Sequence, residues 1–277
     1  MKKHTGFSLG RFLLLAFYVL AAVFPLYWIV VTSLKGPKEI YTMPLQYLPT
    51  SATLDSYRKL FSFSSFSLYF RNSLIVALVS SLLSMAVSIL SGFSLSRYPR
   101  QRTKGILQLA LYFTQTIPTF LIMVPIFTMF SKLGWVDSTG ALMLVYVATV
   151  IAFSTIMSKG FFDRIPVSLE EAAKIDGCSM FQSLIHVVLP ITRPGMAAIF
   201  CFAFINIWNE LFLAVMLLMS NDKMTVPVAL NSFISKAGIS WDVMSAGIVI
   251  ALLPTMIVFG FGQKYIVAGL TEGSVKG

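Results

Sequence analysis

Long apolar runs separated by short polar segments make up most of the chain. Each run reaches the ~20 residues that an α-helix needs to cross the hydrocarbon core of a bilayer. The first run is longer than the hydrophobic region of a signal peptide, so we expect it to remain in the protein as a span. The pattern therefore predicts six membrane spans, at residues 12–34, 72–96, 105–130, 141–162, 194–219 and 243–267.

The composition also indicates a membrane protein rather than a soluble one. Hydrophobic residues make up 57% of the chain and charged residues only 12%. Soluble domains carry roughly 25% charged residues. Backbone N–H and C=O groups that cross lipid must be paired within the protein, and an α-helix pairs them within one segment. The predicted fold class is therefore an all-α membrane protein with six transmembrane helices.

The net charge of +10 reflects membrane topology. Residues 97–104 contain four basic residues and no acid, and residues 1–11 are also basic. Short loops rich in Lys and Arg stay on the cytoplasmic side of a membrane. With six spans, this rule places both termini in the cytoplasm. Membrane topology therefore accounts for the positive charge, and we expect no nucleic-acid partner.

The second predicted span differs from the others in its small residues. It is rich in serine and contains Gly92. Small residues let membrane helices approach each other closely. We therefore expect this helix to lie inside the bundle rather than against lipid.

A polar stretch at residues 168–190 interrupts the apolar pattern on the cytoplasmic side. Ser168 followed by Glu171 has the spacing of a capping box, so a short helix should begin at Ser168. Gly177 stands where many helices end in a left-handed residue. A second short helix, residues 180–188, should follow and end at Pro190. The stretch thus predicts an elbow of two short helices between two spans.

The first helix of this elbow should present a shallow apolar face. Leu169, Ala172 and Ala173 stand at i, i+3 and i+4, so they share one side of a helix. A face of small side chains suits docking into a groove on another protein. An ordinary amphipathic surface elbow is the alternative that these residues leave open.

Three fragments of the elbow resemble the EAA loop of permease subunits of binding-protein-dependent ABC importers. They are Glu171-Ala172-Ala173, Asp176-Gly177 and Leu189-Pro190. In that family the loop forms the coupling helices, which sit in a cleft of the cytoplasmic ATPase subunit. The resemblance implies a type I importer permease bundle with cytoplasmic coupling helices. The ATPase-coupling residues that it implies are Glu170, Glu171, Ala172, Ala173, Asp176 and Gly177.

The resemblance is best over about residues 70–277 and extends to two shorter patterns. The ending GLTEGSVKG is similar to that of the maltose-type sugar-uptake permeases, and the WNE pattern at residues 208–210 is also similar to sugar-uptake permeases. The family implies a second homologous permease subunit, two cytoplasmic ATPase subunits and an extracellular or periplasmic solute-binding protein. It also implies a sugar or polyol substrate, alternating access and a place in the bacterial cytoplasmic membrane.

The resemblance divides the chain into three parts. Residues 1–69 would hold the N-terminal tail, the first span and an outer loop. Residues 70–267 would form the importer transmembrane domain, including the elbow at residues 168–190. Residues 268–277 would be a cytoplasmic tail.

Polar side chains inside the predicted spans are the candidates for a translocation path or gate. Glu210 lies about 24 Å into the fifth span at ~1.5 Å per residue. An ionisable group at such depth is costly and commonly functional. Glu210 could line the path or tie helices at a subunit interface, and Gln115 could line the path or serve helix packing. The candidates are Gln115, Asn206, Trp208, Asn209 and Glu210.

Motifs for catalysis or nucleotide binding are missing from the sequence. It contains no Gly-rich phosphate loop, no HExxH or GxSxG pattern and no cysteine cluster. We therefore expect no enzyme activity, metal or cofactor in this chain, with ATP hydrolysis in the partner subunits. Two other classes stay open. An ion-coupled secondary transporter would need intramembrane ionisable residues such as Glu210, and a non-transporting docking subunit would use the same elbow.

Overall fold

The computed structural model describes residues 9–63, 65–97, 101–235 and 238–271, and these residues are almost entirely helical. The basic tail at residues 1–8 and the side chains of the ending GLTEGSVKG lie outside the described part of the chain. The prediction of an all-α fold is confirmed. The exceptions among the described residues are two paired strands of two residues each, β1 (Ile234–Ser235) and β2 (Gly238–Ile239).

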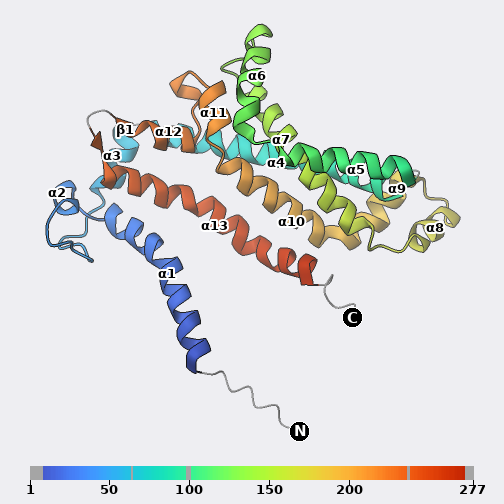
Figure 1. Cartoon of the computed structure of the whole chain (residues 1–277), viewed down its shortest axis with the longest axis horizontal. Coiled ribbons are helices and arrows are strands. Elements are labelled where there is room, and N and C mark those ends of the chain that lie inside the picture. Colours follow the sequence, from blue (N-terminus) through green and yellow to red (C-terminus); the bar gives the residue numbers. More distant parts are fainter. Residues whose placement is uncertain (1–8, 64, 98–100, 236–237, 272–277) are drawn as a thin grey trace. The chain divides into compact units, whose positions relative to one another are not determined.

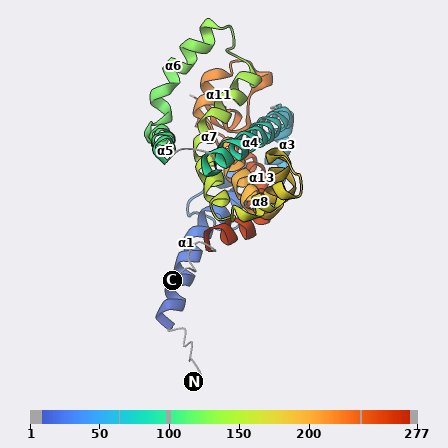
Figure 2. The same ribbon diagram turned by 90° about the vertical axis from the view of Figure 1, so that its right-hand side faces the viewer.

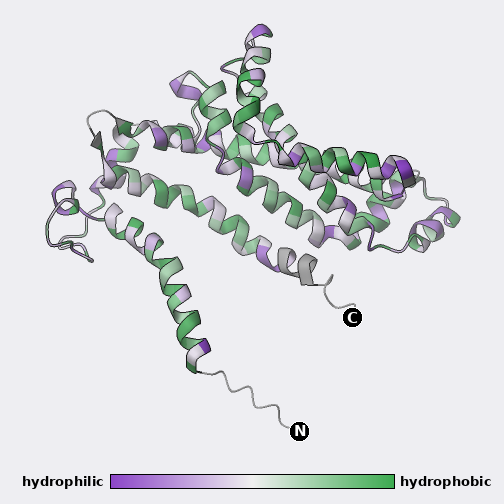
Figure 3. Cartoon of the chain, viewed as in Figure 1, coloured by the Kyte–Doolittle hydropathy of each residue, from purple (hydrophilic) through white to green (hydrophobic). Residues whose placement is uncertain are grey.

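Five described helical segments are long and apolar enough to cross a membrane, and one bent pair of helices provides a sixth candidate. Figure 3 shows hydrophobic residues along the length of the long helices and hydrophilic residues gathered toward the helix ends and connections. The five segments are α1 (Leu9–Ser33), α4 (Phe66–Arg97), α7 (Thr139–Phe162), the run Met180–Trp208 and α13 (Trp241–Thr271).

The bent pair stands where one span was predicted, at residues 105–130. It consists of α5 (Gln101–Thr116) and α6 (Thr119–Lys132), which meet at 94° (Figure 1). Pro118 lies in the break with an extended backbone, φ −61° and ψ 132°. Proline cannot donate a backbone hydrogen bond and disfavours a helical conformation of the preceding residue. The break therefore follows from the sequence, although the prediction of a span did not include it.

The fifth predicted span, residues 194–219, is wrong at both ends. The second elbow helix does not stop at Pro190, because α9 (Met180–Ser183), a π-turn (Leu184–Val188) and α10 (Leu189–Trp208) form one continuous run. Proline is tolerated in the first turn of a helix, and the wider π-turn shifts the carbonyls that its ring would otherwise meet. At the other end the helix stops at Trp208, and α11 (Phe212–Leu217) begins after a short break.

The chain divides into two compact units that interleave in sequence. Unit 1 comprises residues Met1–Ser67 and Ala229–Leu253, and unit 2 comprises Leu68–Val228 and Pro254–Gly277. The predicted division at residues 69 and 70 stays a prediction.

Unit 1 contains α1, the short helices that follow it and the first part of α13. The short helices are α2 (Pro37–Ile40) and α3 (Asp55–Phe63). Leu60 and Phe66 are buried in this unit, and Lys59 lies 3.8 Å from Asp242. The last part of α12 (Val226–Ser232) also belongs here.

The core of unit 2 packs α4, α7, α10 and α11 together. Figure 2 shows α5 and α6 to one side of α7. Ser80, Ser84 and Ser88 of α4 are fully buried. A Cβ placed on Gly92 would lie 2.6 Å from the Cβ of Ser158, so the backbone of α4 touches α7 directly at this point. The prediction is confirmed for the face of α4 that carries these small residues, but the opposite face is exposed at Leu82, Leu83 and Leu90, so the helix lies at the edge of the bundle.

Candidate functional site

The elbow begins with α8 (Ser168–Ile175), but the predicted capping box is absent. Val167 occupies the N-cap position and no described side chain caps the helix. The chain already turns before Ser168, since Pro166 O accepts from Leu169 N at 3.2 Å. Ser168 is therefore inside the helix, where its hydroxyl cannot cap. A capping box forms instead at the next helix, between Ser179 and Gln182.

The predicted end of α8 at Gly177 is confirmed. Gly177 has φ +85°, the left-handed conformation that glycine adopts readily. Cys178 N donates to Ala173 O at 2.9 Å, and Gly177 N donates to Lys174 O at 3.1 Å. These two bonds form a Schellman motif, which satisfies carbonyls at the helix end. The turn therefore fixes the direction in which the chain leaves α8.

The inner face of α8 is held to the bundle by a buried ion pair. Arg97 Nε, at the end of α4, lies 2.6 Å from Glu170 Oε1, and each side chain is 7% exposed. The guanidinium also donates to Phe162 O and Ile165 O, both at 3.0 Å, at the end of α7. A buried pair becomes costly to break once one partner is missing. One guanidinium thus joins α4, α7 and α8.

A second polar contact closes the same end of unit 2. Asp163, directly after α7, pairs with Lys159 and accepts a hydrogen bond from Ser96 at 2.6 Å. Burial raises the pKa of Asp163, but the hydrogen bonds from Lys159 and Ser96 outweigh burial and bring the pKa below its ordinary value. Asp163 is therefore ionised at neutral pH and supports the end of α7.

The outer face of the elbow is exposed and partly apolar. Ile175 is 87% exposed and Phe181 is 60% exposed, with Leu169 and Ala172 also exposed. The predicted face of three residues is corrected at Ala173, which is buried. Contiguous exposed apolar side chains on a surface commonly mark a protein-binding site. The exposed face also carries Glu171, Asp176 and Gly177.

A second polar site lies at the far end of α10, in the break before α11. The Glu210 carboxylate accepts from Leu213 N at 2.9 Å and from Ala214 N at 3.3 Å, so it caps the start of α11. The buried Tyr146 of α7 donates its hydroxyl to Glu210 Oε2 at 2.8 Å. Glu210 therefore lies in a break between two helices and not inside a continuous helix. Its carboxylate supplies the acceptors that the first N–H groups of α11 need.

Four of the five predicted path residues line one cavity of about 380 Å³. Figure 1 shows the elements that supply them, which are α5, α10 and the break before α11. Trp208 is the exception, because it is 3% exposed and its ring lies 5.5 Å from that of Phe70 in the core. The four residues that share the cavity are Gln115, Asn206, Asn209 and Glu210.

A mostly apolar cavity of about 460 Å³ adjoins the polar one and shares part of its lining. Phe153, Phe202 and Asn206 line both cavities. The rings of Phe153 and Phe202 have their centroids 4.3 Å apart. The apolar cavity extends along α7 to Arg164, beyond the end of that helix. The two cavities therefore lie next to each other along α7 and α10, and we call them together the trough.

Sequence reasoning missed two residues that organise these sites. Arg97 was interpreted only as part of a basic loop, although it ends an apolar helix at the same membrane face as the elbow. Tyr146 is an ordinary aromatic residue in an apolar run. Nothing in the sequence indicates its hydrogen bond to Glu210, because the two residues are 64 positions apart in the chain.

Comparison with known proteins places the chain in a family. The family model described as "binding-protein-dependent transport system inner membrane component" matches residues 84–272. The chain belongs to this family. It is therefore a membrane component of a transport system, and the two alternative function classes find no support. The inner-membrane location that the resemblance implies is confirmed.

Similar proteins match over nearly the whole chain. One is the inner membrane ABC transporter permease protein YcjP of Escherichia coli (strain K12), 32% identical over 99% of both chains. Another is the sulfoquinovosyl glycerol transport system permease protein SmoH of Agrobacterium fabrum, 33% identical over 96% of this chain and 93% of that one. A solved structure, a bacterial ABC transporter involved in import of the acidic polysaccharide alginate, matches with TM-score 0.77 at 25% identity. That match covers 91% of this chain and 94% of the other.

Proposed function

We propose that this chain is the permease subunit of an ATP-driven importer that moves a saccharide along the trough between α7 and α10. The observation that carries the proposal is the cavity in which Asn206, Asn209 and Glu210 face the aromatic pair Phe153 and Phe202. Two similar proteins have saccharide or glycoside substrates in their descriptions, sulfoquinovosyl glycerol and alginate. These substrates favour a carbohydrate over other solutes.

The chemistry of the trough suits a sugar ring. A saccharide offers hydroxyl groups around its edge and C–H groups on its faces. Amide and carboxylate groups such as those of Asn206 and Glu210 can bond hydroxyls, while aromatic rings such as Phe153 and Phe202 can cover a face. A pocket that is mostly apolar with a few converging polar groups is the usual form of a small-molecule site.

In the proposed mechanism the elbow carries the movement of an ATPase subunit into the bundle. The exposed face with Glu171, Ala172 and Ile175 docks in the ATPase. The inner pair Glu170–Arg97, 2.6 Å apart, passes the displacement to the ends of α4 and α7. Because α7 also lines the trough, a displacement of α8 by the ATPase would reach the path through α7. This link is a physical basis for coupling the ATP sites to the path.

The proposal includes the remaining partners and the orientation. Two ATPase subunits hydrolyse ATP on the cytoplasmic side, which is the side of α8, the basic loop and both termini. A second, homologous permease subunit completes the bundle as a heterodimer. A solute-binding protein delivers the saccharide on the opposite side, where the Glu210 end of the trough lies.

The test is uptake by the complete complex in proteoliposomes, with ATP inside and saccharide-loaded binding protein outside. Asn206→Ala and Glu210→Gln should each lower ATP-dependent uptake at equal amounts of assembled complex. Asn221→Ala, an exposed amide outside the trough, is the matched control. Uptake that needs an ion gradient instead of ATP, or that is unchanged in both trough variants, would contradict the proposal.

A further inference from the structure

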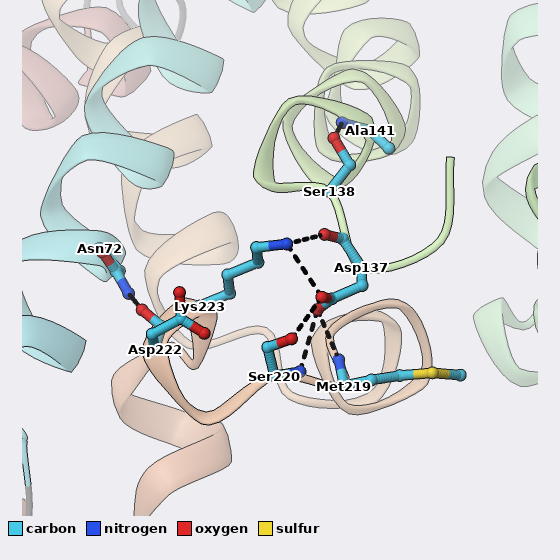
Figure 4. A network of polar contacts seen from close by, with 8 residues as sticks. All are labelled: Asn72, Asp137, Ser138, Ala141, Met219, Ser220, Asp222 and Lys223. Carbon is cyan, nitrogen blue, oxygen red and sulfur yellow. Dashed lines mark hydrogen bonds and ion pairs between the residues drawn. The ribbon is translucent and has the colours of Figure 1, made fainter. Parts of the chain in front are cut away.

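A network of hydrogen bonds and one ion pair surrounds Asp137, in the connection between α6 and α7 (Figure 4). Its carboxylate accepts from Met219 N at 2.9 Å and Ser220 N at 3.0 Å, and from the Ser220 hydroxyl. Lys223 Nζ lies 2.9 Å from the same carboxylate and also donates to Asp137 O at 2.6 Å. We call this set of contacts the Asp137 clamp.

The clamp holds the end of α11. Asp137 N donates to the carbonyl of Leu217, the last residue of α11, at 2.7 Å. Leu217 and Leu213 are fully buried, so α11 is also packed on its inner side. The helix is about 9 Å long at ~1.5 Å per residue. Its start is capped by the Glu210 carboxylate, its end is bound by the Asp137 backbone N–H, and the Asp137 carboxylate binds Met219 and Ser220, just beyond the helix.

The segment after α11 is fixed to α4 as well. Asn72 Nδ2 donates to Asp222 O at 2.8 Å and to Met224 O at 3.1 Å (Figure 4). Ser73 Oγ accepts from Val226 N at 2.7 Å in a buried contact. The chain beyond α11 is therefore anchored at several points, while Glu210 at the start of α11 borders the cavity.

Asp137 has a backbone conformation that few side chains tolerate. Its φ is +61°, and among residues other than glycine, Asp and Asn adopt this region most readily. Hydrogen bonds from the Ser220 hydroxyl and backbone, together with Lys223, hold the pKa of Asp137 far below its ordinary value. The carboxylate of the clamp is therefore charged throughout the neutral range.

We propose that Asp137 is a positioning residue of the translocation path, which fixes α11 and through it the Glu210 carboxylate at the cavity. The inference rests on the proposed function, because it takes the cavity at Glu210 as part of the path. Asp137 itself does not line that cavity. Its effect on the path would be exerted through the six residues of α11.

Four substitutions separate the charge, the acceptor and the backbone conformation. Asp137→Gly keeps the positive φ and removes the carboxylate. Asp137→Asn keeps one acceptor oxygen and removes the charge. Lys223→Met removes the cation and its hydrogen bond to Asp137 O, and leaves the Asp137 side chain in place. Asp222→Asn is the matched control, because the Asp222 carboxylate makes no hydrogen bond or ion pair among the described residues of this loop.

The probe is a membrane-impermeant maleimide, which makes the measurement independent of the substrate's identity. The substitution Asn209→Cys places a single thiol at an exposed position in the cavity, beside Glu210. The native Cys178 and Cys201 are replaced by Ser and Ala. The labelling rate of the introduced thiol is measured in the full complex in proteoliposomes, normalised to the assembled complex. Uptake is measured in the same preparations.

We expect Asp137→Gly to change the labelling rate of the introduced thiol by about tenfold, the scale of one lost charge-assisted hydrogen bond. Asp137→Asn should give an intermediate rate, because its amide oxygen can still accept from Met219 N and Ser220 N while the charge is lost. Asp222→Asn should keep the parent rate. Glu210→Gln should change the rate too, and combining it with Asp137→Gly should add little, because both act on α11. Lys223→Met should give a smaller change in the same direction. It replaces Asp137→Gly in the labelling experiment if the Asp137→Gly complex does not assemble.

The outcomes that overturn the inference differ from those that overturn the proposed function. If Asp137→Gly or Lys223→Met lowers only the amount of complex and leaves the labelling rate at the parent value, Asp137 is merely structural. Full additivity of Asp137→Gly and Glu210→Gln also overturns the inference and leaves the path in place. If the thiol introduced by Asn209→Cys never reacts in the parent complex, the cavity is not aqueous. That result would contradict both the inference about Asp137 and the proposed function.

Discussion

The two ends of unit 2 each use a carboxylate to hold a short helix, but with different partners. At the elbow, Glu170 of α8 meets the Arg97 guanidinium, and both side chains are buried. At the break, Glu210 meets only neutral donors, the backbone N–H groups of α11 and the Tyr146 hydroxyl, among the described residues. The first arrangement ties one helix to two others. The second leaves the carboxylate beside a cavity.

The difference indicates distinct roles for the two sites. An ion pair out of contact with water holds its geometry strongly, because losing one partner leaves a buried charge. This suits an element that must transmit displacement without yielding. A carboxylate held by neutral donors can exchange a protein partner for a substrate hydroxyl at small cost. This suits a site that binds and releases.

The largest predicted effect follows from breaking the elbow pair. Arg97→Met leaves Glu170 buried without its cation, and we expect a loss of about 3–5 kcal/mol in the docking of α8 onto the bundle. Uptake and substrate-stimulated ATP hydrolysis should both collapse, as measured in proteoliposomes. The double variant Arg97→Met with Glu170→Leu removes both charges and should recover part of the loss. Equal failure of the single and double variants would show that the ion pair is not the link.

The next effect is expected at the other end. Tyr146→Phe removes one donor to the Glu210 carboxylate, a charge-assisted bond of about 1.5–3 kcal/mol. Uptake should fall about tenfold or more, while the complex should still assemble because the ring stays packed. The control is Tyr112→Phe, an exposed tyrosine of α5. A Tyr146→Phe complex with parental uptake would remove Glu210 from the proposed path.

A smaller effect is expected at the turn of the elbow. Gly177→Val forces a branched side chain into φ +85°, at a cost of about 1–2 kcal/mol. The spans should insert normally, while co-purification of the ATPase with the complex declines. Gly177→Asn should behave almost like the parent, because asparagine tolerates this conformation. If valine and asparagine give the same ATPase yield, the Schellman turn does not set the docking geometry.

The smallest effect is expected at Asp163 and depends on pH. The pKa of Asp163 is lowered in the folded protein, so its stabilising contribution is present above its ordinary pKa and is lost as pH falls below it. Asp163→Asn should therefore lower the melting temperature at pH 7 and have less effect near pH 3. The loss should be roughly 0.3–0.5 kcal/mol, the scale of an i,i+4 pair. A loss that grows at acid pH would contradict this sign.

Much of this fold could be predicted from the sequence because lipid imposes simple rules. The apolar runs predict the number of helical spans, and the C-cap at Gly177 follows from local backbone chemistry. The break at Pro118 could have been predicted from the same chemistry. Pro190 shows the limit, because its effect depends on the π-turn in front of it, which no local pattern indicates.

The site was less predictable, for a physical reason. The polar residues Asn206, Asn209 and Glu210 stand out in an apolar run, and they share a cavity with Gln115. The residues that hold these sites in place do not stand out, since Tyr146 is an ordinary aromatic residue in an apolar run, and Arg97 and Asp137 lie in loops or at helix ends where charges are ordinary. Contacts between residues so far apart in sequence become visible only when the helices are packed.

The most direct test of the account is whether the trough changes sides with ATP. Asn206→Cys, at the junction of the two cavities, would be labelled by an impermeant maleimide in complexes lacking Cys178 and Cys201. We predict labelling from the α8 side without nucleotide and from the opposite side with a non-hydrolysable ATP analogue. Labelling from the same side in both states would contradict the claim that the elbow drives alternating access along α7 and α10.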